Sequence, residues 1–250
     1  VAAPAGAPTA PPLVLLHQSP LSGRMFDRLL PLLATRRAVI AVDTPGYGES
    51  DRPSTQPTLA AYGDAIAETL GKHHEPPFDL LGYHTGAVIA ADIAARRPAE
   101  VRRLVLVSIP YFDDGRRNAL LKQLATKAGY AEDGSHLLPL WTGSFRVKPQ
   151  GQSLDDVARL VAEKQRVGQF GEWALAAAMA ADMTPMLRAI RHPSLVIAPH
   201  DGLEKESRAA AGLLRHGRLT ELPARGYGLF DAAAAEIAKL VTAFLDSQPA

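Results

Sequence analysis

Short, largely apolar runs alternate along the chain with longer segments of helical periodicity. The runs are rich in Leu, Val and Ile and mostly show no alternation of polar and apolar positions, which is typical of strands covered on both faces. The predicted strands are 13–16, 38–42, 78–81, 104–107, 194–197 and 218–222. The predicted helical segments of this alternation are 25–33, 59–70, 87–96, 204–214 and 232–245. Strand and helix in this order predict a doubly wound α/β fold with a mostly parallel sheet and right-handed crossovers.

The alternation of strands and helices is interrupted between about residues 112 and 188. This stretch is rich in Ala and Leu, shows no convincing strand, and predicts helices at 116–128, 154–167 and 171–181. A helical insertion in a doubly wound sheet is best explained as a cap over the carboxyl ends of the strands, where such folds bind ligands. We therefore predict a single domain over 1–250, with a helical cap insertion at 112–188.

The amino-acid composition excludes several classes of binding partner. With 250 residues, 47% of them hydrophobic, the chain can bury one full core. The 27 basic and 26 acidic residues are scattered, so neither nucleic acid nor a charged membrane surface is an expected partner. The absence of cysteine excludes thiol nucleophiles and thiolate metal sites, and the eight histidines form no metal-ligand cluster in the sequence, so no metal is expected.

No apolar run approaches the roughly 20 residues of a membrane span. Residues 1–12, rich in Pro and Ala, lack the charged and apolar regions of a signal peptide and predict an extended lead-in to the first strand. A cytoplasmic location is the expectation.

The segment Gly82-Tyr83-His84-Thr85-Gly86 follows a predicted strand and opens a predicted helix. This placement resembles the nucleophile elbow of the α/β-hydrolase fold superfamily, G-x-S-x-G, whose glycines allow a tight turn around a strained residue. Further segments resemble that family's landmarks in the same order: 13–20, 43–51, 101–107, 193–201 and 226–230. The resemblance covers about residues 12–246. The family usually begins with an antiparallel hairpin, so either the sequence is trimmed or the sheet starts later.

The resemblance implies a catalytic triad that this chain keeps only in part. Asp201 matches the acid, but His84 stands in place of the nucleophilic serine and Tyr227 in place of the base histidine. Ordinary Ser-His-Asp hydrolysis needs a hydroxyl that an oriented imidazole activates, so two of its three parts are missing. The imidazole of His84, about 2 Å longer than a serine side chain, could instead meet Asp201 or the Tyr227 hydroxyl. Oriented by Asp201, it would act as a general base, with Tyr227 as a hydrogen-bond donor or acid.

The resemblance also implies an oxyanion hole made by the backbone N–H groups of Gln18 and Thr85, which could stabilise an enolate as well as a tetrahedral oxyanion. The candidate substrate-binding residues are His17, Tyr83, Tyr111, Trp141 and Trp173. Two alternatives stay open. Asp113 or Asp114 could be the acid, and Ser19, Ser22 or Thr85 could be a displaced nucleophile.

These residues predict an enzyme without a cofactor, acting on a small, mostly apolar molecule through His84, Asp201 and Tyr227. Hydrolysis by activated water is one possible reaction, and proton transfer in a lyase, isomerase or cyclase is the other. The alternative from another class is a ligand-binding pseudoenzyme or receptor-like protein that kept the pocket and lost turnover. The sequence does not predict the oligomeric state.

Overall fold

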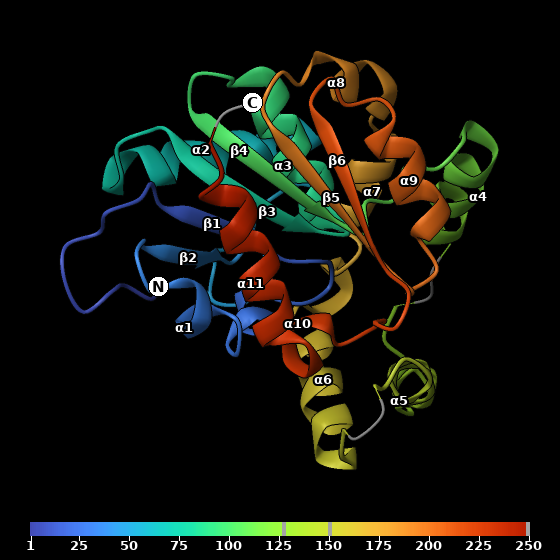
Figure 1. The fold of residues 1–250 in the computed structure, drawn as a ribbon. Coiled ribbons are helices and arrows are strands. Elements are labelled where there is room, and N and C mark those ends of the chain that lie inside the picture. Colours follow the sequence, from blue (N-terminus) through green and yellow to red (C-terminus); the bar gives the residue numbers. More distant parts are fainter. Residues whose placement is uncertain (127–128, 150–151, 249–250) are drawn as a thin grey trace.

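A sheet of parallel strands forms the centre of the computed structural model, which describes residues 1–126, 129–149 and 152–248 (Figure 1). In the described chain the sheet has six strands in the order β2-β1-β3-β4-β5-β6. The strands are β1 (Leu13–Leu16), β2 (Val39–Val42), β3 (Phe78–Tyr83), β4 (Val101–Val107), β5 (Ser194–Pro199) and β6 (Gly217–Leu222). In the register, Leu15 of β1 lies between Ala41 of β2 and Leu81 of β3. The predicted parallel α/β sheet is confirmed.

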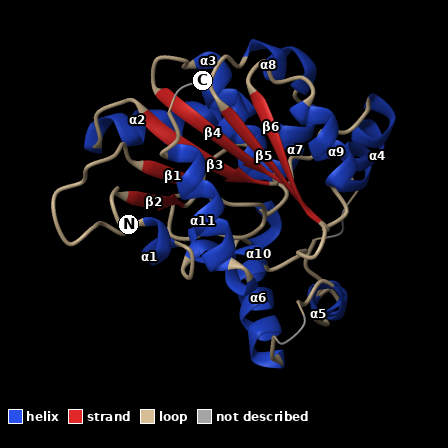
Figure 2. Cartoon of the chain, in the orientation of Figure 1, coloured by secondary structure: helices blue, strands red, loops and turns tan. Residues whose placement is uncertain are grey.

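Helices cover both faces of the sheet (Figure 2), which explains why β1 is apolar and buried at all of its positions. Val14 and Leu16 point into a core shared with α2 (Leu59–His73) and α3 (Thr85–Arg96). The alternate residues Leu13 and Leu15 point into a second core, on the other face. The elements of that face are the 3-10 helix η1 (Gly23–Phe26), α1 (Leu30–Leu33), α10 (Leu229–Ala232) and α11 (Ala234–Leu245). The two cores follow directly from the two-residue period of a strand.

The segment between β4 and β5 is helical, as predicted, but its helices differ in their packing. They are α4 (Asp114–Ala125), α5 (Leu137–Arg146), α6 (Leu154–Arg166), the 3-10 helix η2 (Gly168–Phe170), α7 (Trp173–Ala180) and α8 (Met183–Ala189). Figure 1 shows α5 and α6 standing away from the sheet. By contrast, Ala178 of α7 and Leu187 of α8 are fully buried in the core that contains α3. The boundaries of the predicted cap, 112–188, remain a prediction.

Several predicted helix limits shift. The single helix expected at 25–33 is divided into η1 and α1, because the Ser22 hydroxyl accepts the Arg24 N–H and caps a separate short turn. The helix expected at 204–214 is α9 (Glu204–Ala211), and the one expected at 232–245 is divided at Ala233 into α10 and α11. The predicted end of the helix 116–128 lies outside the described residues.

The N-terminal residues touch the outer edge of β2. The N–H of Ala2 donates to the Val39 carbonyl at 2.9 Å, and the N–H of Val39 donates to the Ala2 carbonyl at 2.8 Å. This is an isolated antiparallel bridge beside an otherwise parallel sheet. Within the described ranges, no helix combines the length and apolar character that crossing a lipid bilayer requires.

Candidate active site

Three neighbouring strands end at the edge of the sheet where the candidate site lies. His84 follows β3, Ser108 follows β4, and Asp201 lies two residues after β5. Because β3, β4 and β5 are parallel neighbours, their carboxyl ends meet at the same edge. The topology therefore brings together residues that are up to 117 positions apart in the sequence.

The turn that carries His84 has a strained backbone. His84 has φ 49° and ψ −114°, a conformation that side-chain-bearing residues rarely adopt. A Cβ atom at Gly82 would lie 2.2 Å from the Gly86 carbonyl oxygen, and one at Gly86 would lie 2.1 Å from the Leu16 carbonyl oxygen. Both positions therefore require glycine, and the close packing against β1 holds His84 at the apex of the turn.

Asp201 is the most heavily hydrogen-bonded side chain of the site. Its Oδ2 accepts from the Ser108 hydroxyl at 2.6 Å and from the Tyr83 hydroxyl at 3.3 Å. The same oxygen lies 3.1 Å from Nε2 of His84, and Oδ1 accepts the Leu203 N–H at 3.3 Å. Burial raises the pKa of Asp201, but the hydrogen bonds from His84, Ser108 and Leu203, with the attraction of a charged His84, outweigh it and bring the pKa below its usual value. Asp201 is therefore a buried carboxylate.

The partner of His84 decides which ring nitrogen carries the proton. A carboxylate only accepts hydrogen bonds, so Nε2 of His84 donates to Asp201 and, in the neutral ring, Nδ1 carries the lone pair. Within the described part of the chain, Nδ1 has no hydrogen-bond partner. The side chain is 20% exposed and lines a pocket of about 1160 Å³. An imidazole held in this way can accept a proton at Nδ1.

The pocket is mixed in character. The Tyr83 ring lies 4.2 Å from the His84 ring and packs edge-on against Phe230 at 5.1 Å, between ring centroids. Helix α6 adds charged groups, among them Asp156 and Arg159. The pocket is therefore lined by aromatic rings beside His84 and by charged side chains along α6. This lining is less uniformly apolar than the sequence predicts.

Tyr227 lines the same pocket and is 40% exposed. Its hydroxyl makes no hydrogen bond to any part of the chain that the structure describes. Partial burial, followed by the negative charges of Asp201 and Glu204, raises the pKa of Tyr227 above its ordinary value. The phenol therefore stays protonated at neutral pH and can donate a hydrogen bond to a ligand.

His17, predicted to bind substrate, is instead buried behind the pocket wall. Its Nε2 accepts the Thr44 N–H at 3.0 Å, and its Nδ1 donates to the Gln18 carbonyl at 3.0 Å. Burial lowers the pKa of His17, which keeps the ring neutral for these two bonds. His17 therefore joins the end of β1 to the loop after β2.

The other predicted aromatic residues are spread over the molecule. Tyr83 lines the His84 pocket, whereas Trp173 lines a different one. The Tyr111 hydroxyl is hydrogen-bonded to that of Thr184 at 2.9 Å, and neither Tyr111 nor Trp141 is among the residues that line these two pockets. Sequence alone could not sort these rings, because aromatic residues serve packing and binding equally well.

The alternative acids have structural roles at the start of α4. Asp113 caps this helix by accepting the Arg116 N–H at 2.9 Å, and the side chain of Asp114 is 85% exposed and paired with Arg117. Neither carboxylate contacts His84, so the geometry favours Asp201 over both.

The alternative hydroxyl nucleophiles have no contact with the imidazole of His84. The Ser22 hydroxyl donates to Glu163, and the Ser19 hydroxyl lies 3.4 Å from that of Tyr47. Thr85 is buried, with 2% exposure. Within the described residues, no serine or threonine hydroxyl is hydrogen-bonded to His84.

Ser108 is the residue that sequence reasoning missed. It is fully buried, has φ 49°, and donates the shortest hydrogen bond that Asp201 receives. The available signal was a small hydroxyl residue directly after the predicted strand 104–107. Among the side chains that the structure describes, three or more histidines and carboxylates nowhere gather as a metal site would require.

Curated relatives match parts of the chain. A pimeloyl-[acyl-carrier protein] methyl ester esterase of Chromobacterium violaceum is 39% identical over 99 residues, which is 39% of this chain and 37% of that protein. A 1-acylglycerol-3-phosphate O-acyltransferase of Arabidopsis thaliana is 35% identical over 144 residues, or 54% of this chain and 33% of that protein. The matched regions thus span about a third of the length of these relatives.

Solved structures match nearly the whole fold. An enol-lactonase from Burkholderia xenovorans LB400 superimposes with a TM-score of 0.82 at 18% identity, covering 98% of this chain and 95% of that one. A hydrolase from Pseudomonas aeruginosa PA01 gives a TM-score of 0.78 at 23% identity, with 97% and 92% covered. The sequence profile of the family described as the alpha/beta hydrolase fold matches residues 11–182, more than half of the chain. The protein therefore belongs to the α/β-hydrolase fold family.

Proposed function

We propose that this protein is an enzyme without a cofactor that hydrolyses a carboxylic ester or lactone with a water molecule activated by His84. The observation that carries the proposal is the 3.1 Å contact between Nε2 of His84 and the buried Asp201, which leaves the lone pair of the neutral ring on Nδ1 of this pocket-lining residue. Water activation by an oriented imidazole needs no hydroxyl nucleophile. This suits a site in which a histidine stands at the apex of the elbow.

The reaction divides into two proton transfers. Nδ1 of His84 takes a proton from water while the water oxygen bonds to the carbonyl carbon, and the carbonyl electron pair moves to oxygen. When the tetrahedral intermediate collapses, the bond to the leaving oxygen breaks and the imidazolium returns the proton to it. Asp201 stays a carboxylate throughout and stabilises the imidazolium that forms between the two steps.

Two backbone donors support the transient oxyanion. In the described chain, the N–H groups of Gln18 and Thr85 have no intramolecular acceptor. Gln18 lines the pocket at the end of β1, and Thr85 is the first residue of α3, where the helix dipole favours negative charge. We assign the oxyanion hole to this pair, and we assign to the Tyr227 phenol a hydrogen bond to the substrate.

The names of similar proteins agree with ester chemistry, since they include methyl ester esterases and an enol-lactonase. Proton transfer is the second candidate, because the same base and the same two N–H groups could form and stabilise an enolate. In that reaction Nδ1 would remove a proton next to a carbonyl group. The mostly apolar substrate of either reaction remains a prediction.

The test is a screen of esters, lactones and carbonyl compounds with exchangeable C–H bonds, run in D₂O and in water. The wild-type protein should hydrolyse an ester or lactone, and His84→Ala should lower kcat/KM by about 10²- to 10⁴-fold, the contribution of a general base. His200→Ala is the matched control, because the side chain of His200 is 76% exposed and paired with Glu204.

Other results of the screen would contradict the proposal or favour a different function. Full activity in His84→Ala would contradict the proposal, and an acyl adduct seen by intact-protein mass spectrometry during turnover would replace water activation with covalent catalysis. Deuterium incorporation without hydrolysis would favour proton transfer. Ligand binding without any turnover, unchanged in His84→Ala, would favour the receptor-like alternative.

A further inference from the structure

A second pocket lies among α4, α5, α6 and α7, away from His84. Its volume is about 830 Å³, within the range of sites that hold small molecules. It shares only Pro20 and Lys164 with the described residues that line the His84 pocket. Neither His84 nor Tyr227 lines it, so the proposed hydrolysis does not account for it.

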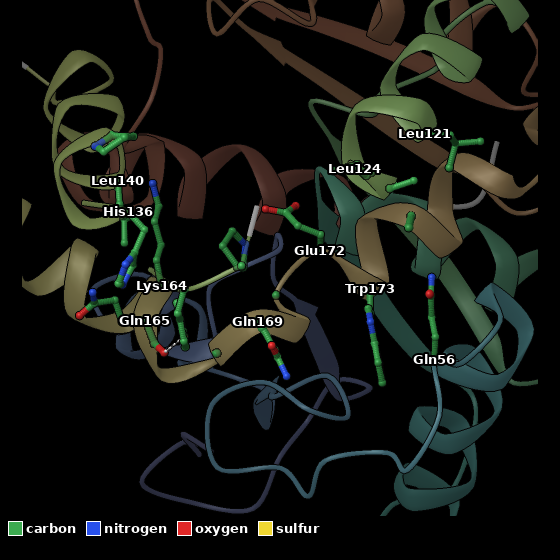
Figure 3. A pocket seen from close by; sticks show the side chains of 18 residues that line it. Gln56, Leu121, Leu124, His136, Leu140, Lys164, Gln165, Gln169, Glu172 and Trp173 are labelled. Carbon is green, nitrogen blue, oxygen red and sulfur yellow. Dashed lines mark hydrogen bonds between the residues drawn. The ribbon is translucent and has the colours of Figure 1, made fainter. Parts of the chain in front are cut away.

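The two sides of this pocket differ in chemistry. Figure 3 shows Leu121, Leu124 and Trp173 on one side, and His136 and Lys164 on the other. The apolar side comes from α4 and α7, which pack against each other. Burying an apolar body against these side chains is favourable whatever the head group that it carries.

The polar side presents hydrogen-bond donors. Nδ1 of His136 accepts the Ala131 N–H at 3.1 Å, so Nε2 carries the proton of the neutral ring. The ammonium group of Lys164 donates to the Ser144 hydroxyl at 3.0 Å, which fixes its position on α6. A proton on Nε2 of an imidazole and a lysine ammonium together match a group that accepts hydrogen bonds and carries negative charge.

Glu172 also lines the pocket and is the one carboxylate among its described lining residues. Figure 3 places it between the polar and apolar sides. A negative charge there disfavours an anion close to it, so the charged group of a ligand is expected on the far side, at His136 and Lys164.

We propose that this pocket is a second ligand site, which binds an apolar monocarboxylate. The hydrocarbon body lies against Leu121, Leu124 and Trp173, and the carboxylate meets His136 and Lys164. Lys164 also lines the His84 pocket, so a carboxylate held by its ammonium group would lie next to the wall of that pocket.

The probe is decanoate, with binding measured by isothermal titration calorimetry on the full chain. Leu124→Trp, which fills the site from α4, and Ala176→Phe, which fills it from α7, should each weaken binding at least tenfold. Leu160→Trp is the control that fills the His84 pocket, and Leu138→Trp is the control on a side chain that is 68% exposed. Both controls should bind decanoate as the wild-type protein does. Circular dichroism identifies a variant that fails to fold, and the filling variant on the other helix then decides.

Charge variants test the head group. Lys164→Met should weaken decanoate binding about tenfold, the loss expected for one charge-assisted hydrogen bond, and Glu172→Gln should strengthen it. Decanol and decyltrimethylammonium should bind more weakly than decanoate. The proposal is overturned if decanoate does not bind, if the filling variants bind it normally, if Leu160→Trp abolishes binding, or if the three head groups bind alike. Binding that persists in His84→Ala separates this site from the proposed catalytic function.

Discussion

Replacing Asp201 by Asn tests the proposed function at the contact on which it depends. The change keeps the size of the side chain but removes the negative charge that faces Nε2 of His84 at 3.1 Å. At an effective dielectric constant of about 20, an ion pair at this distance has a Coulomb energy of about 5 kcal/mol. The cost of burying the carboxylate offsets part of this energy.

Measured hydrogen bonds to charged groups are worth about 1.5–3 kcal/mol. If His84 bears a full charge only during the reaction, the loss falls on the transition state, and kcat/KM should drop about 10- to 150-fold. The assay is initial-rate kinetics on the best ester or lactone of the screen. KM should change little, because Asp201 lies behind His84 and does not line the pocket.

Ser108→Ala is the matched control. It removes the 2.6 Å hydrogen bond to the same carboxylate oxygen but keeps the charge, so its effect on kcat should be smaller. Asp201→Asn with unchanged kcat, or with a loss confined to KM, would refute the assignment of Asp201 as the group that orients the base.

The same carboxylate predicts a pH dependence of stability. The pKa of Asp201 is lowered in the folded protein, so the folded state binds fewer protons than the unfolded chain. Its stabilisation is therefore complete above a pH of about 4 and is lost as the pH falls through the lower folded-state pKa. In urea titrations from a pH of about 6 to about 3, the free energies of unfolding of the wild-type protein and Asp201→Asn should converge. A difference that stays constant over this window would contradict the lowered pKa.

Three further predictions concern Tyr227, Gly86 and Asp79. Tyr227→Phe should lower kcat/KM only a few-fold, since it removes one neutral hydrogen bond of about 0.5–1.5 kcal/mol; a loss as large as that of His84→Ala would make Tyr227 a catalytic acid. Gly86→Ala should lower the free energy of unfolding, measured in urea, by at least about 1–3 kcal/mol, because its Cβ would lie 2.1 Å from the Leu16 carbonyl oxygen. Gly71→Ala is the control and should be stabilising, because no atom lies within 4 Å of the added Cβ. Asp79→Ala should lower the free energy of unfolding by up to about 3–5 kcal/mol, because it removes the carboxylate 2.9 Å from the buried Arg37 and leaves Asp246 as the remaining partner. A loss under about 1 kcal/mol would show that Asp246 alone compensates the charge of Arg37.

The succession of strands and helices along the chain and the position of the elbow could be predicted from the sequence, because each depends on local pattern. Val39–Val42 and Ser194–Pro199 are short apolar runs, and the turn at His84 needs a glycine on either side. The pairing of His84 with Asp201 was foreseen as a possibility from the family resemblance, and the structure places the two side chains in contact.

The predictions that failed had either a weak local signal or a dependence on long-range packing. Helices α5 and α8 were not predicted, since Leu137–Arg146 contains a proline and Met183–Ala189 is too short for a clear period. His17 was expected in the pocket because of its neighbours in the sequence, but its direction is set by the Thr44 N–H, 27 residues away. Ser108 reaches Asp201 only because β4 and β5 are adjacent, which no local pattern of the sequence reveals.

The helices between β4 and β5 have a consequence for how this protein could be altered. Leu104 pairs with Ser194, so two hydrogen-bonded neighbours in the sheet are joined by a connection of about ninety residues. The entropy lost in closing a connection grows only with the logarithm of its length, so lengthening or shortening α5 and α6 changes the cost of joining β4 to β5 very little. The base and its carboxylate belong to the ends of the strands, whereas much of the pocket wall belongs to this connection. Chimeras that exchange α5 and α6 could therefore alter substrate selection while the reacting groups stay in place.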